Sequence, residues 1–437
     1  MRLASLALVC AIVMFIGRPE RADGASWLVV SDIHYNPLYH PASHPGSDTQ
    51  QALLDSLFGA LRAAEPHPPV VIIPGDFLAH GFYGWDAAPT MRELARRFDR
   101  TFPGSQFVIT LGNNDSDCGD YEITPGGAFL RAVAQAWAPL VDRNGAAPGF
   151  MRTFARDGSY VASLPIPKLR AVVVNDVYWS PRYRNRCGRG SDPTLRAFSE
   201  LRGMLRAGSA GSHNWLVLHI PPGIDVFSTQ FTRGLFVVPF LSPDADARLQ
   251  ALVDDPANHV ALVLAAHSHK FAYRLIGAGG SRPVPVLLAP SVSPIFYNAP
   301  SFLRIDVDGH GTIRNATEFS FDWKRWRAIG GLNSLGVERF TGPDLLELQR
   351  RMERNRNLRQ TFARLYDGAG SIEITDANWR YYLCAATVLS TAPYAACARS
   401  ARIAQFTPWG LRLGALLALI LLVALVAFVT RNRQKTA

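Results

Sequence analysis

The segment WLVVSDIHYNP, residues 27–37, decides the fold. Its apolar and partly β-branched start, Trp27–Val30, predicts a buried strand that ends on Asp32 and His34. Side chains two positions apart on a strand point to the same face, so this carboxylate and imidazole are expected to project together. Both groups suit divalent transition metals, and the pair predicts half of a metal site. Asp-x-His pairs also arise by chance, so the site needs partners elsewhere in the chain.

Two further strands end in polar residues. Val70–Ile73 is followed by Gly-Asp76, and Phe107–Thr110 is followed by Leu-Gly-Asn113. Helical spacing of apolar residues separates the three strands at residues 48–64 and 90–98. Strand and helix alternating at this spacing predict a parallel α/β sheet, with functional residues at the carboxyl ends of the strands.

Two later strands end in histidine. Asn214–Leu218 leads into His219, and Val260–Leu264 leads into His267 and His269. Taken singly, each polar residue has an ordinary explanation, such as a core histidine, a turn or a helix cap. Seven oxygen and nitrogen ligands after five strands make chance a poor explanation for the set.

The remainder of the chain adds strands and helices but no repeat. A strand and a helix are expected in the middle, and short alternating strands follow them. Two Arg-rich helices with a break near residues 353–357 come next. The expected segments are residues 170–174, 193–207, 284–321 and 343–366.

The two ends of the chain predict export and anchoring. Residues 1–24 combine a basic start, an apolar run and small residues at the end, which is typical of a secretory signal peptide. An uncleaved anchor is the alternative. Residues 413–429 carry no charge and precede a basic tail, which predicts a transmembrane helix over 409–430 and a cytoplasmic tail, 431–437. The main domain is therefore expected on the periplasmic or extracellular side of the cell membrane.

Composition and cysteines limit the class of protein. An apolar content of 48% supports a globular core, and a net charge of +10 is spread along the chain. The sequence lacks the clustered basic stripe that would predict nucleic-acid binding. A nucleotide is kept only as one of the expected substrates. Outside the signal peptide, four cysteines permit three disulfide connectivities, of which we favour Cys118–Cys187 with Cys384–Cys397.

The order of these motifs carries a family resemblance. Asp-x-His, Gly-Asp, Gly-Asn-Asn-Asp, a single His and His-x-His resemble the signature of the calcineurin-like metallophosphoesterases. Four segments narrow the resemblance to the acid-sphingomyelinase-like phosphodiesterase branch: SDIHYNP (31–37), GDFLAH (75–80), HIPPG (219–223) and APSVSP (289–294). The resemblance implies an α/β fold, a four-layer α/β/β/α sandwich over residues 25–330, and a small helical C-terminal subdomain over 331–405.

The resemblance also implies a centre with two metal ions. One ion would be held by Asp32, His34 and His269. The other would be held by Asn113, His219 and His267, with Asp76 bridging the two. Such a pair clamps a phosphate and supplies a hydroxide that attacks phosphorus. The oxygen and imidazole ligands permit Zn²⁺, Fe or Mn²⁺, and the resemblance favours zinc.

Two positions depart from the family pattern. Asn114 stands where the family has a histidine, and an amide donates a hydrogen bond but cannot act as a general acid. His80 therefore becomes the candidate proton donor, although it could be an ordinary surface histidine. Asp115 is expected to orient Asn114 or a metal ligand. Ala266 replaces the usual glycine of the last motif.

The expected function is hydrolysis of a phosphodiester, a nucleotide or polyphosphate by an exported, membrane-anchored enzyme. A sphingomyelinase-like phospholipid phosphodiesterase is an alternative, because the C-terminal helix would hold the domain beside a bilayer. A catalytically weak phosphate-binding or sensor module is a second alternative, since Asn114 replaces the histidine of the family motif.

Overall fold

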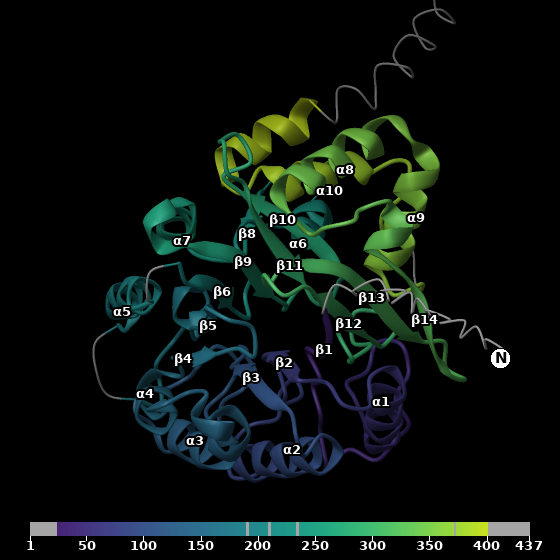
Figure 1. Cartoon of the computed structure of the whole chain (residues 1–437). Coiled ribbons are helices and arrows are strands. Elements are labelled where there is room, and N and C mark those ends of the chain that lie inside the picture. Colours follow the sequence, from purple (N-terminus) through teal and green to yellow (C-terminus); the bar gives the residue numbers. More distant parts are fainter. Residues whose placement is uncertain (1–23, 189–191, 209–210, 233–235, 371–372, 401–437) are drawn as a thin grey trace, which may run out of the picture.

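The computed structural model describes residues 24–188, 192–208, 211–232, 236–370 and 373–400 (Figure 1). The expected transmembrane helix, the cytoplasmic tail and all but the last residue of the expected signal peptide lie outside these ranges. Within them, no helix combines the length and the apolar character needed to cross a bilayer.

The first sheet has six strands in the order β14-β13-β12-β1-β2-β3. Its strands are β1 (Ala25–Val29), β2 (Val70–Pro74), β3 (Gln106–Thr110), β12 (Ser301–Val307), β13 (Ile313–Phe321) and β14 (Trp326–Gly331). As predicted, β1, β2 and β3 run parallel, whereas β12 pairs antiparallel with β1. The carboxyl ends of the three parallel strands therefore meet at one edge of the sheet.

The second sheet also has six strands, in the order β10-β11-β9-β6-β5-β4. They are β4 (Tyr160–Ser163), β5 (Leu169–Val173), β6 (His213–Val217), β9 (Val260–Ala265), β10 (Ala272–Ile276) and β11 (Val284–Leu288). The four inner strands are parallel, and the two edge strands are antiparallel to their neighbours. A small pair, β7 (Ile224–Asp225) and β8 (Val238–Pro239), lies apart from both sheets.

The two sheets pack together through large buried side chains. Trp27 of β1 and Trp215 of β6 are fully buried, with ring centroids 5.3 Å apart. The Tyr160 hydroxyl accepts a hydrogen bond from the Ile109 amide at 2.8 Å and donates one to the Ile109 carbonyl at 2.9 Å. This contact satisfies the hydrogen bonding of a buried hydroxyl and joins the two sheets. In the packed sheets, the loops that follow β1, β2, β3, β6 and β9 lie close to one another.

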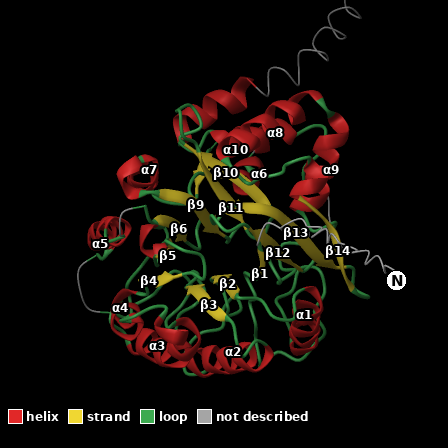
Figure 2. Cartoon of the chain, in the orientation of Figure 1, coloured by secondary structure: helices red, strands yellow, loops and turns green. Residues whose placement is uncertain are grey.

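Helices cover the outer faces of both sheets (Figures 1 and 2). Beside the first sheet lie α1 (Gln51–Ala64), α2 (Ala87–Thr101) and α3 (Ala128–Val141), whereas α4 (Phe150–Asp157) packs on α3 and on β4 at the edge of the second sheet. Beside the second lie α5 (Thr194–Arg206) and α7 (Pro243–Asp254). The predicted mixed α/β fold is confirmed, and α1 buries the five apolar residues whose spacing predicted it. Neither α3 nor α4 was predicted.

Three helices follow the last strand and lie against β10, β11 and β14 (Figure 1). They are α8 (Gly342–Arg354), α9 (Arg356–Tyr366) and α10 (Trp379–Thr387). The predicted break falls at Asn355, whose side chain accepts a hydrogen bond from the Leu358 amide and so caps α9. Both favoured disulfides, Cys118–Cys187 and Cys384–Cys397, are present.

Candidate metal centre

All seven expected ligands lie in loops just beyond the strands that predicted them. Asp32 and His34 follow β1, however, and are not part of it, because β1 ends at Val29. The prediction that strand alternation aligns their side chains is therefore wrong. The loop backbone directs them instead, through hydrogen bonds from the Asp32 amide to the Gly75 carbonyl and from the His34 amide to the Asp76 carbonyl.

Five of the seven expected ligands have a left-handed backbone conformation. Their φ angles are 46° for Asp32, 46° for His34, 53° for Asp76, 65° for His267 and 61° for His269. Residues other than glycine rarely adopt this region, at a cost of about 1–3 kcal/mol each when the surroundings enforce it. Such outliers gather at functional sites. Their concentration here supports a binding role for these loops.

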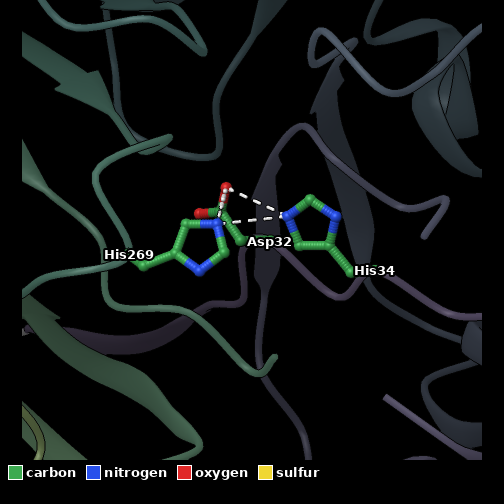
Figure 3. Close-up of side chains that lie close together, drawn as sticks. All are labelled: Asp32, His34 and His269. Carbon is green, nitrogen blue, oxygen red and sulfur yellow. Dashed lines mark hydrogen bonds and ion pairs between the residues drawn. The ribbon is translucent and has the colours of Figure 1, made fainter. Parts of the chain in front are cut away.

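The first ligand cluster joins Asp32, His34 and His269, all of them buried (Figure 3). Nε2 of His269 lies 3.2 Å from Nε2 of His34 and 3.5 Å from Oδ1 of Asp32. The carbonyl of Leu78 can only accept a hydrogen bond, so Nδ1 of His34, 3.1 Å away, carries the proton. The Nε2 lone pair of His34 therefore faces the cluster, as in metal-ligating histidines.

The second cluster joins Asp76, His219 and His267, with Asn113 beside them. Nδ1 of His219 donates to the Pro74 carbonyl at 2.8 Å, which leaves Nε2 facing Oδ1 of Asn113 at 3.1 Å. The Asn113 amide nitrogen donates to Oδ1 of Asp120 at 2.6 Å. This bond fixes which end of the amide points inward: the oxygen, the better metal ligand.

Asp76 lies between the two clusters. Its Oδ2 is 3.4 Å from Nε2 of His34 and 3.3 Å from Nε2 of His219, the place that the expected bridging ligand requires. Asn114 holds this carboxylate through its backbone amide at 2.8 Å and its side-chain amide at 2.9 Å. A Cβ at Gly112 would lie 2.1 Å from Oδ1 of Asp76, so only glycine permits this approach.

The donor set fits two divalent cations. Oδ1 of Asp32 is buried and receives no hydrogen bond from any described residue, so its lone pairs are left for a cation. Carboxylate, amide oxygen and imidazole are the ligand types that Zn²⁺, Fe and Mn²⁺ share. Since Oδ2 of Asp76 also approaches His34 of the first cluster, the seven side chains have the arrangement that two such ions would need.

Burial sets the protonation of the imidazoles. It lowers the pKa of His34 to about 4 and that of His267 to about 3, so both are neutral at pH 7. The neutral form is the one that binds a metal. Burial also lowers the pKa of His219, but the charge and hydrogen bond of Asp76 outweigh burial and raise that pKa to about 10. The position beside Asp76 therefore favours a positive charge, which a bound cation would supply.

His80 stands at the edge of the site, with its side chain 38% exposed. Its ring stacks on that of His34 with centroids 4.3 Å apart, and its Nδ1 lies 3.0 Å from Oδ1 of Asp48. Burial lowers the pKa of His80, but the hydrogen bond and charge of Asp48 outweigh burial and raise it. Its other ring nitrogen is thus available for proton transfer while Asp48 stabilises the imidazolium.

The two remaining candidates act on neighbouring residues. Both polar contacts of Asn114 described above go to Asp76. Asp115 accepts hydrogen bonds from the backbone amides of Phe77 at 2.8 Å, Leu78 at 3.1 Å and Gly112 at 2.8 Å. Asp115 therefore ties together the loops after β2 and β3, and the described contacts give it no bond to the Asn114 side chain.

Three carboxylates of the site were missed by sequence reasoning. Asp48 holds His80, and Asp120 holds the Asn113 amide. Asp176 accepts hydrogen bonds from the amides of His219 at 3.1 Å and Ile220 at 3.0 Å. Asp176 could have been found, because it follows the predicted strand at 170–174. No comparable pattern marks Asp48 or Asp120.

This arrangement agrees with the family comparison. The family model described as calcineurin-like phosphoesterase matches residues 26–271, more than half of the chain. The chain therefore belongs to the calcineurin-like phosphoesterase family. Within that family its similarity is to the acid-sphingomyelinase-like phosphodiesterases, the branch that the sequence motifs predicted.

Two relatives illustrate that similarity. Sphingomyelinase phosphodiesterase D of Dictyostelium discoideum is 24% identical over 281 residues, which cover 63% of this chain and 60% of that protein. Acid sphingomyelinase-like phosphodiesterase 3b of Mus musculus is 24% identical over 295 residues, 61% of each chain. The match thus spans about three fifths of each relative. Among solved structures, GAP50, the anchor in the inner membrane complex of Plasmodium, is 13% identical with a TM-score of 0.44, covering 81% of this chain and 97% of that one.

Proposed function

We propose that this protein is a metal-dependent phosphodiesterase. The observation that carries the proposal is the pair of ligand clusters on either side of Asp76, whose Oδ2 lies 3.4 Å from His34 and 3.3 Å from His219. Family membership and the phosphodiesterase names of the relatives support the same activity. Hydrolysis of a phosphodiester by the purified protein would distinguish this enzyme from the alternative, a phosphate-binding module.

Two zinc ions are the proposed cofactors, held by the seven ligands as the sequence resemblance implies. When bound, such a pair supplies Lewis-acid stabilisation of the phosphoryl oxygens and a nucleophile at neutral pH. The chain supplies the fixed geometry. Backbone carbonyls orient His34 and His219, Asp120 orients Asn113, and Asn114 holds Asp76.

His80 is the proposed proton donor to the leaving oxygen. It lines the same cavity as Asp76, Asn113 and His269, and Asp48 steadies its protonated form. Asn114 cannot take this role, because an amide does not release a proton near neutral pH and its contacts are to Asp76.

The proposed location is the outer side of the cell membrane. Two sequence features support it: the signal-peptide pattern at residues 1–24 and the uncharged run within 409–430. Protease treatment of intact spheroplasts or sealed cells tests this placement. Digestion of the main domain supports it, whereas protection of that domain would refute it.

The activity is tested with bis-p-nitrophenyl phosphate and purified, metal-analysed protein. We expect hydrolysis that disappears on chelation, returns with added Zn²⁺ or Mn²⁺, and is abolished in His219→Ala. A matched control is His213→Ala, an exposed histidine at the opposite end of β6, which should leave the rate unchanged. If the metal-loaded protein hydrolyses no phosphoester, the proposed phosphodiesterase activity is refuted and a phosphate-binding module is favoured.

A further inference from the structure

A cavity of about 530 Å³ extends from the candidate metal centre into the body of the protein. At one end it is lined by Asp76, Asn113 and His269, and at the other by side chains of the C-terminal helices, among them Phe362 and Tyr382. Its volume lies within the roughly 300–1,000 Å³ of small-molecule sites. The cavity is therefore large enough for an organic group attached to a phosphate at the metal centre.

Aromatic rings stand directly beside the metal ligands in this cavity. The ring of Phe240 lies 5.6 Å from that of His267, at an interplanar angle of 73°. The ring of Phe296 lies 4.7 Å from that of His269, also at 73°. A phosphate bound by the two clusters would thus place its ester groups against apolar surface.

The far wall of the cavity comes from the C-terminal helices. Phe362 and Tyr366 belong to α9, and Tyr382 and Leu383 belong to α10. Arg274 of β10 holds this wall in place, because its guanidinium donates to the Ala385 carbonyl of α10 at 2.8 Å. The C-terminal helices thus form part of the cavity that adjoins the metal centre.

Two of the three cations that line the cavity are paired with carboxylates. Lys270 contacts Asp367 at 2.5 Å and Glu373 at 3.0 Å, and Arg182 pairs with Asp120 at 3.0 Å. The third, Arg274, donates to the Ile224 and Ala385 carbonyls, each at 2.8 Å, and so holds the far wall through backbone oxygens.

We propose that this cavity binds the apolar ester group of the substrate, a ring or an alkyl chain. The inference rests on the proposed function and narrows it. The preferred substrate is a phosphodiester with an apolar organic group. Phe240 and Phe296 are the proposed specificity-determining residues nearest the phosphate.

The test is calorimetric binding of phosphonates to the full-length, metal-loaded protein in detergent. Burial of a ring or a butyl chain should make phenylphosphonate and butylphosphonate bind at least about tenfold more tightly than methylphosphonate. The ratio of the phenyl to the butyl affinity shows which apolar group fits better.

A matched pair of variants locates the binding. Phe240→Ala should lower the phenyl-to-methyl affinity ratio severalfold, and Phe236→Ala should preserve it, since Phe236 is 71% exposed outside the cavity lining. Equal affinities for methyl-, phenyl- and butylphosphonate would overturn the inference even if phosphodiesters are hydrolysed. Apolar preference in a protein without hydrolysis would refute the proposed function instead.

Discussion

Replacing Lys270 should uncouple the metal-binding loop from the C-terminal helices. Lys270 follows the expected ligand His269, is buried, and bonds to Asp367 and Glu373 at the end of α9 and beyond it. Lys270→Met keeps the length of the side chain but leaves two carboxylates facing each other without a cation. Breaking a buried ion pair in this way costs about 3–5 kcal/mol, a large share of the ~5–15 kcal/mol that stabilises a typical domain.

Urea unfolding of the metal-stripped protein, followed by tryptophan fluorescence, measures this cost without the contribution of bound metal. The triple variant Lys270→Met, Asp367→Asn, Glu373→Gln removes both stranded charges and should recover most of the loss. A free energy of unfolding for Lys270→Met within about 1 kcal/mol of the wild-type value would refute the reasoning, because an exposed ion pair contributes no more than that to stability. A triple variant no more stable than the single one would refute it equally.

Three further predictions concern the buried Asp246, the proposed acid His80, and Asp120 beside the ligand Asn113. Burial raises the pKa of Asp246 to about 6 from an ordinary 3.8, so the native state loses stability as pH rises from 4 to 6. Asp246→Asn should therefore gain up to about 3 kcal/mol on the wild type between pH 4 and pH 7, and a constant difference in unfolding free energy would contradict this. His80→Ala should slow cleavage of an alkyl phosphodiester by about 10²–10⁴-fold while sparing a p-nitrophenyl ester, and equal losses on both would exclude His80 as the acid. Asp120→Ala frees the Asn113 amide and should weaken metal binding or activity by about 10–100-fold, whereas unchanged metal titration and kinetics would show that Asp120 does not orient the ligand.

The sequence predicted the strands and the ligands because both leave a local pattern. Buried parallel strands appear as apolar runs, and the polar residues after Ile73, Thr110 and Leu264 mark the ends at which function is expected. The break between α8 and α9 was predictable for the same reason, since Asn355 interrupts the helical spacing.

Other features depend on the tertiary structure and leave no such pattern. Helix α3 is an exception, because its buried residues recur at helical spacing, but the internal Pro139 argues against a helix there. The left-handed backbone of Asp32 and His34 arises from hydrogen bonds to residues 75 and 76. Asp48 and Asp120 join the site only because their loops fold beside it. The aromatic cavity likewise needs the C-terminal helices to be packed against β10.

The central claim is that seven side chains hold two metal ions and that the two ions share the carboxylate of Asp76. Anomalous scattering from crystals of the zinc-loaded protein, measured on both sides of the zinc absorption edge, tests it most directly. We predict two peaks about 3.5–4 Å apart, one beside Asp32, His34 and His269 and the other beside Asn113, His219 and His267, with Asp76 between them. A single peak, or peaks remote from Asp76, would contradict the two-metal centre.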